Sequence, residues 1–172
     1  MISPDYCRRM ARYNAWQNRQ MGKAMAGLSP DELTRDRGAF FGSILGTANH
    51  LIWADSIWLS RFAGTPKPAG GIKESPAMFA TLAEWQADRF RLDGHVQEWA
   101  ENLGSLDLTG DLRWYSGAAG REVSKPLGLL VMHFFNHQTH HRGQIHAMLT
   151  AAGATLGDTD LFLMPESGRG WK

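Results

Sequence analysis

Four of the seven histidines stand in one short stretch, HFFNHQTHHRGQ, residues 133–144. On an α-helix, residues three or four apart share a face, so His133, His137, His140 and His141 would form one polar stripe. Two imidazoles at positions i and i+4 can reach the same ion, and both His133/His137 and His137/His141 have that spacing. Imidazole suits zinc, nickel and iron. The stretch therefore indicates a metal site, but its spacing does not choose between the two pairs.

A third ligand must come from elsewhere in the chain, because catalytic zinc sites usually take three protein ligands. The single cysteine, Cys7, excludes a site built on cysteine pairs. His50 lies in the apolar stretch ANHLIWAD, where a free imidazole would be poorly tolerated. His95 lies in RLDGHVQEW among polar neighbours. We therefore expect His50 as the third ligand and a solvent-exposed His95.

The same histidines could instead be hydrogen-bonded core residues without a metal. The motif is not HExxH, since Gln138 stands where a zinc peptidase places its glutamate base, so peptidase chemistry is disfavoured. No general base can be assigned, and the catalytic residues stay unknown.

Groups that could support the ligands are also open. Asp55 follows His50 by five residues, off its helical face, so we expect a surface or capping role for it rather than a hydrogen bond to the ligand. Asn136 and Gln144 are alternatives for that supporting bond. Arg142 fits either an anionic substrate or a structural salt bridge.

The elements that must position these residues are long helices. Ser-Pro pairs and apolar periodicity predict helices over residues 4–26, 43–62, 75–103 and 124–152. A single helical turn is expected after Ser29, a hairpin or irregular excursion near residues 106–123, and a tail that packs back or stays loose. The prediction is an all-α four-helix bundle forming a single domain over residues 1–172.

Composition excludes several classes of protein. Eighteen basic and seventeen acidic residues give a net charge of +1 with no basic run, which argues against a nucleic-acid partner. No segment is apolar enough for a signal peptide or a membrane span, so we expect no membrane association. With one cysteine, a cytoplasmic location is expected. The wide apolar surface of several helices favours a homodimer.

Three stretches together resemble the DinB/YfiT-like family of four-helix metalloproteins: YNAWQNRQM, NHLIWADSIWLSRF and HFFNHQTHHRGQIHAML. The resemblance implies an up-down-down-up bundle that is dimeric. It also implies that one histidine of the second helix and the two of H-x-x-x-H in the fourth bind the metal. Carried over by position, these are His50, His137 and His141, and the remaining histidines of the last helix, His133, His140 and His146, are non-ligands. For His140 we expect a dimer contact.

The resemblance further implies one divalent metal ion per chain, nickel or zinc first and iron third. It suggests a transferase that joins a low-molecular-weight thiol to an electrophile, so the expected partner is a small-molecule substrate. The alternatives are a metal-dependent hydrolase and a non-enzymatic metal-binding bundle. A helical interaction module without metal remains a third class.

Overall fold

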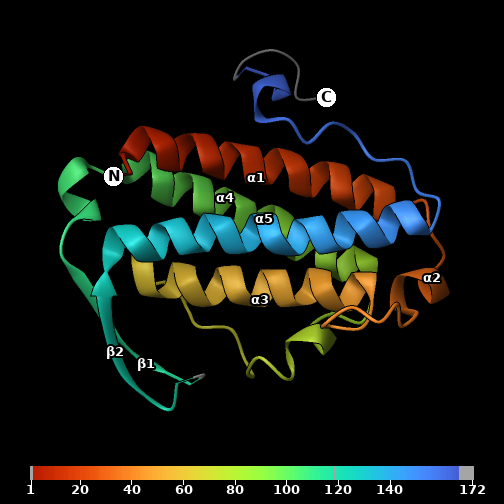
Figure 1. The fold of residues 1–172 in the computed structure, drawn as a ribbon, viewed down its shortest axis with the longest axis horizontal. Helices are drawn as coiled ribbons and strands as arrows, with labels where there is room; N and C mark the ends of the chain where they lie inside the picture. Colours follow the sequence, from red (N-terminus) through yellow and green to blue (C-terminus); the bar gives the residue numbers. More distant parts are fainter. Residues whose placement is uncertain (1, 118, 167–172) are drawn as a thin grey trace.

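The computed structural model describes residues 2–117 and 119–166, and it is mostly helical (Figure 1). Four long helices lie side by side: α1 (Pro4–Met25), α3 (Ile44–Ala63), α4 (Leu82–Asn102) and α5 (Leu127–Ala151). A short helix, α2 (Pro30–Thr34), stands between α1 and α3, as the sequence predicted. The expected all-α fold needs a correction, because strands β1 (Asp111–Ser116) and β2 (Arg121–Pro126) pair antiparallel between α4 and α5.

The helices begin where side chains can satisfy the free backbone N–H groups of the first turn. Ser3 accepts a hydrogen bond from the Tyr6 amide at the start of α1, and Ser43 accepts one from the Gly46 amide at the start of α3. Gly64 ends α3 in the left-handed conformation with φ +68°, which glycine adopts without strain.

Two predicted boundaries were wrong. The third helix begins at Leu82 and not at Ser75, because Thr81 and Glu84 form a reciprocal capping box, whereas Ser75–Ala77 makes one 3₁₀ turn. The last helix begins at Leu127, because residues 121–126 hydrogen-bond to β1 as a strand.

The directions of the long helices follow from which residues meet. α1 and α5 run one way, and α3 and α4 run the other, so each pair α1/α4 and α3/α5 is antiparallel. The contacts that show this are Arg8–Glu101 and Asn18–Asp93 between α1 and α4, His50–His141 and Phe62–Phe134 between α3 and α5, and Asp55–Arg89 and Phe62–Trp99 between α3 and α4.

A buried ion-pair network, which we call the Arg89 network, ties all four long helices together. Arg89 of α4 lies 2.6 Å from the Asp55 carboxylate and 2.8 Å from that of Asp93. Gln138 of α5 donates to Asp55 at 3.0 Å, and Asn18 of α1 donates to Asp93 at 2.9 Å. The expected surface or capping role of Asp55 was therefore wrong: it is 1% exposed and pairs with Arg89. The network fixes the register of α3 against α5 because its bonds are directional.

The tail packs back on the bundle. The Tyr13 hydroxyl donates to the Thr159 carbonyl at 2.6 Å, and the Gln17 amide donates to the Asp158 carbonyl at 2.9 Å. Over residues 2–117 and 119–166, no helix combines the length and the apolarity that a membrane crossing requires.

Candidate metal centre

Three histidines from two antiparallel helices meet on the α3/α5 side of the bundle. His50 comes from α3, and His137 and His141 come from successive turns of α5. One nitrogen of each ring lies within 4.8 Å of the other two, and the Nε2 atoms of His137 and His141 are 3.1 Å apart. No other group of three His, Cys, Asp or Glu residues in the described ranges could hold an ion. The structure thus brings together the three residues that the family resemblance implied.

Hydrogen bonds on the outer side of two rings decide which nitrogens are free. The Ser75 hydroxyl donates to the Ile72 carbonyl at 2.7 Å, so toward His50 Nδ1, 2.9 Å away, it acts as an acceptor. His141 Nδ1 lies 2.8 Å from the Gln144 side-chain oxygen, which accepts only. Both Nδ1 atoms therefore carry the proton, and both Nε2 atoms keep a lone pair for a ligand.

The residue before His50 holds the segment that carries Ser75. The Asn49 side-chain amide donates to the carbonyls of Pro76 and Phe79 at 2.8 and 2.9 Å. Because Asn49 and His50 are neighbours on the buried N-terminal half of α3, one helical turn anchors both the ring and its hydrogen-bond acceptor.

An aromatic ring covers one face of the His50 imidazole. Phe41 stacks on it with 3.8 Å between ring centroids, and lies 5.6 Å from His141. Gly46 makes this approach possible, since a Cβ there would lie 2.6 Å from the Phe41 carbonyl oxygen. The stacked ring shields one flank of the histidine group from water.

The site favours neutral imidazoles, the form that binds metals. Burial, and next the neighbouring His141, lowers the pKa of His50 to about 4. Burial and the adjacent histidines lower the pKa of His137 to about 3, and burial lowers the pKa of His141 as well. All three rings are therefore uncharged at neutral pH.

A divalent metal ion fits this donor set. Metal–nitrogen bonds of roughly 2.1 Å hold two ligand nitrogens no more than about 4.2 Å apart, a limit that His137 and His141 meet at 3.1 Å. The ligand nitrogen of His50 lies within 4.8 Å of both, close enough for a small ring movement to bring it to the same ion. A proton on His137 Nε2 would form a hydrogen bond to His141 alone and leave His50 without a partner. A metal cation could bind the lone pairs of all three rings. Nitrogen donors without oxygen donors favour zinc, nickel or iron over magnesium or calcium.

The other sequence candidates lie outside this group. His133 and His140 flank it on exposed positions of α5, and Asn136 and His95 are also exposed. The exposure of His95 and the supporting bond of Gln144 confirm two predictions. The expectation that His140 makes a dimer contact stays a prediction.

Arg142 faces α1 and not the histidine group. It is buried, its guanidinium lies 5.5 Å from the Tyr13 ring, and burial lowers its pKa to about 10. Its hydrogen bond goes to the Thr139 hydroxyl at 3.4 Å, and no ion pair with a described carboxylate forms. The proposed salt bridge is therefore not present within residues 2–117 and 119–166.

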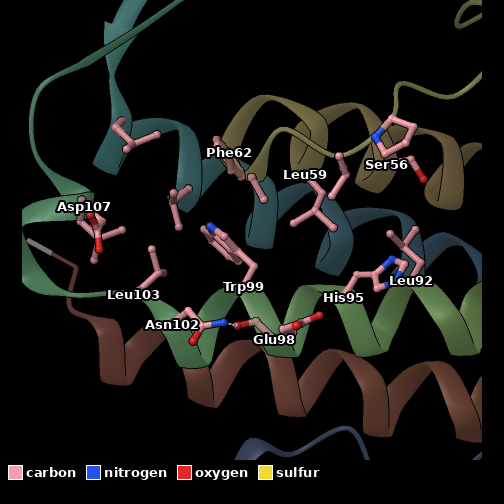
Figure 2. Close-up of a pocket in the computed structure, with 16 residues that line it drawn as sticks. Ser56, Leu59, Phe62, Leu92, His95, Glu98, Trp99, Asn102, Leu103 and Asp107 are labelled. Atoms are coloured by element: carbon pink, nitrogen blue, oxygen red, sulfur yellow. Dashed lines mark hydrogen bonds between the residues drawn. The ribbon is translucent and has the colours of Figure 1, made fainter.

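A separate hollow of about 870 Å³ opens at the end of the bundle between α3 and α4. Its lining includes Leu59 and Phe62 of α3 and Trp99 of α4, and Figure 2 shows Trp99 extending from α4 toward α3. Its lining includes none of the three metal-site histidines. The histidine group and this hollow are therefore two distinct features of the surface.

Sequence reasoning missed Ser75 and Phe41. Ser75 looked like a helix start, 25 residues from His50, and no periodic signal links a loop residue to a helix across such a distance. Phe41 precedes α3 in a segment with no regular period. The nearby glycines, including Gly46, were the one available sign of a close backbone approach.

Three comparisons with known proteins agree with this fold. The model of the DinB family matches residues 1–170. The curated Protein DinB of Bacillus subtilis (strain 168) is 26% identical over 170 residues, which cover 91% of each protein. A crystal structure of a DinB-like protein from Bacillus cereus ATCC 10987 superposes with a TM-score of 0.62 at 18% identity, covering 83% of this chain and 89% of that one. The chain belongs to the DinB family.

Proposed function

We propose that the chain is a metal-dependent thiol S-transferase whose single divalent ion is held by His50, His137 and His141. The observation that carries the proposal is the convergence of three neutral imidazoles with their Nδ1 protons engaged elsewhere on two of them. When bound, such an ion acts as a Lewis acid that favours the thiolate form of a thiol.

The protein orients the ligand rings and keeps water away from one flank of the histidine group. Ser75 and Gln144 hold the rings of His50 and His141 in the tautomer that a ligand requires. Phe41 covers one flank of His50. Three protein ligands leave a coordination position for a substrate, as in catalytic and not structural zinc sites.

Thiol transfer suits the site better than hydrolysis. A bound ion would lower the pKa of water as well, but hydrolysis gains further from a carboxylate or histidine base that takes up the proton. No described Asp or Glu belongs to the histidine group, and Asp55 is engaged by Arg89 and Gln138. A thiol, whose ordinary pKa of about 8.5 lies far below that of water, reaches its nucleophilic form with less help from such a base.

Nickel and zinc are the proposed ions, with iron as a third choice. All three accept imidazole nitrogen, and zinc also accepts thiolate sulfur. A cytoplasmic homodimer remains our expectation for the working form.

The experiment that tests the site is elemental mass spectrometry on untagged protein purified without a metal column. We expect about one ion per chain in the wild type, because a three-histidine site binds one divalent ion. His50→Ala and His137→Ala each remove one of three ligands and should lose stoichiometric metal. His133→Ala is the matched control on the same helix and should keep it.

Loss of metal in His133→Ala alone would overturn the ligand assignment. Full metal in His50→Ala would do the same. If the wild type carries one ion, the loaded protein is then screened for consumption of low-molecular-weight thiols with alkyl halide and epoxide electrophiles. Ester hydrolysis without thiol consumption would reject the transferase proposal in favour of a hydrolase.

A further inference from the structure

A smaller hollow of about 350 Å³ lies between α1, α5 and the tail, which runs back along the bundle after α5 (Figure 1). Its volume is within the roughly 300–1,000 Å³ that is usual for small-molecule sites. None of His50, His137 and His141 lines it. It also shares no lining residue with the larger hollow between α3 and α4, so it is a third, separate feature of the molecule.

The tail closes one side of this hollow through hydrogen bonds from α1. The Tyr13 hydroxyl donates to the Thr159 carbonyl, and the Gln17 side-chain amide donates to the Asp158 carbonyl. The Gln20 amide donates to the same Asp158 carbonyl at 3.2 Å. These bonds place three polar side chains of the lining in the service of the tail, so the charged recognition of a ligand falls to α5.

Arg142 of α5 lines the hollow as a buried cation with unused donors. It is 8% exposed, and its Nη1 has no hydrogen-bond partner in the described part of the chain. Its Nη2 donates to the Thr139 hydroxyl over 3.4 Å, near the limit of a hydrogen bond. Buried donors without an acceptor cost free energy, and those of a charged group cost the most. An anion in the hollow would supply the acceptor.

The nearby Arg89 network explains the charge of Arg142 but not its open donors. Asp55 and Asp93 attract Arg142 through space. Their carboxylates are bound within the network, and neither forms an ion pair with Arg142. Attraction over a distance stabilises a cation at this position and uses none of its N–H groups. The donors thus remain available for a ligand.

We propose that Arg142 binds the carboxylate of a small monocarboxylic acid in this hollow, at a site separate from the metal centre. Two N–H groups of a guanidinium match the two oxygens of a carboxylate in a bidentate pair. His146 lies one turn further along α5, on the same helical face, and lines the same hollow, where its ring can donate a further bond. Met21, Ala147 and Leu156 give the hollow an apolar wall for the body of the acid.

The surroundings of Arg142 favour a carboxylate over a phosphate. Phosphate sites in proteins use helix N-termini or clustered free backbone N–H groups. Arg142 lies in the C-terminal half of α5, where the backbone N–H groups are bonded within the helix. Arg142 is the one permanently charged side chain of the lining, and a single guanidinium matches the single charge of a carboxylate.

The test is calorimetric titration of the full chain with butanoate, hexanoate, phenylacetate and 3-phenylpropanoate, each beside its uncharged amide. We expect at least one acid to bind about 10- to 100-fold more tightly than its amide, the range for hydrogen bonds to a charged group. Arg142→Gln should remove this preference. Arg142→Lys should restore only part of it, because an ammonium keeps the charge but not the bidentate geometry. Failure of all four acids to bind, or equal binding of acids and amides, overturns the inference.

A second variant tests the location without removing the buried arginine, whose loss also affects stability. Ala147 is exposed on α5 and lines the hollow, so Ala147→Phe should fill part of it and abolish binding of the acid. Ala151→Phe is the matched control, an exposed alanine one turn further along α5 and outside the lining, and should bind as the wild type does. Wild-type affinity in Ala147→Phe overturns the inference.

The remaining comparisons separate this site from the metal centre and from a phosphate site. A carboxylate also binds metal ions, so the titration is repeated on His137→Ala, which should keep the preference for the acid. Loss of the preference in that variant would place the acid on the metal and overturn the inference. Tighter binding of inorganic phosphate than of every acid would overturn it as well. Metal content reports on the proposed function, whereas the preference for the acid reports on Arg142, so either can fail alone.

Discussion

Two polar clusters lie only one residue apart on α5 and yet differ in what completes them. Gln138 belongs to the Arg89 network, where each buried charge faces an opposite charge of the protein. His137 belongs to the histidine group, where ring nitrogens of His50, His137 and His141 converge. Within its described residues, the protein supplies no hydrogen-bond donor that could satisfy the lone pairs of all three. A cluster whose charges are paired within the protein serves the fold, whereas a cluster of lone pairs with too few donors is suited to a ligand.

The largest effect is expected when the Arg89 network loses its central cation. Arg89→Met leaves Asp55 and Asp93 buried without their counter-charge, so we expect the free energy of unfolding to fall by about 3–5 kcal/mol. Urea denaturation measures it. The matched control is Arg91→Met, two residues along α4, which removes only an exposed ion pair with Asp88 and should cost less than about 1 kcal/mol. Similar losses in both variants would mean that the network does not hold the helices together.

A smaller effect is expected when the histidine group loses the hydrogen bond that orients His50. Ser75→Ala removes the acceptor of the His50 Nδ1 proton, so metal affinity should fall by about 10- to 100-fold without being abolished. Competition with a chromophoric chelator gives the dissociation constant. Ser60→Ala, which removes a hydroxyl bonded within α3, is the control and should leave the affinity unchanged. Unchanged affinity in Ser75→Ala would show that the serine bond does not orient the ring.

The smallest expected effect is the response of the metal-free protein to pH. The folded-state pKa values of His50 and His137, about 4 and about 3, lie below the unfolded value near 6.5, so the unfolded chain binds more protons as the pH falls. The free energy of unfolding should therefore decrease between pH 7 and pH 6, by less than about 1 kcal/mol for each histidine.

Denaturation of chelator-treated protein at both pH values measures this decrease, and His137→Ala should show a smaller one. An equal decrease in the variant would mean that His137 is as easily protonated in the fold as in the unfolded chain. Together, the three tests show whether the Arg89 network contributes mainly to stability and the histidine group mainly to metal binding.

The helices were accessible from the sequence because they depend on local spacing, whereas the candidate ligand set needed both spacing and the family resemblance. The helical repeat predicted a histidine pair on one face but left His133/His137 and His137/His141 open, and the family resemblance chose the second pair. The apolar surroundings of His50 marked it as the third residue. The hairpin was also predictable, since Val123 pairs with Trp114 across a glycine-containing turn.

What could not be predicted depends on contacts between distant segments. Asp55 has no helical relation to His50, and only the packing of α4 shows that Arg89 neutralises it. The start of α4 was misplaced because Ser75-Pro76 and Thr81 both resemble helix openings, and only Thr81 completes its box with Glu84.

The two hydrogen bonds from the Asn49 amide have a consequence for the loop that precedes Ser75. Asn49 holds Pro76 and Phe79 directly on α3, and the Ser75 amide donates to the Gly71 carbonyl, so the contacts that place Ser75 come from α3 and from residues 71 onward and not from residues 64–69. We therefore expect residues 64–69 to tolerate changes in length and sequence while the histidine group keeps its geometry. This loop is also the natural place to graft a randomised segment when a new substrate preference is wanted.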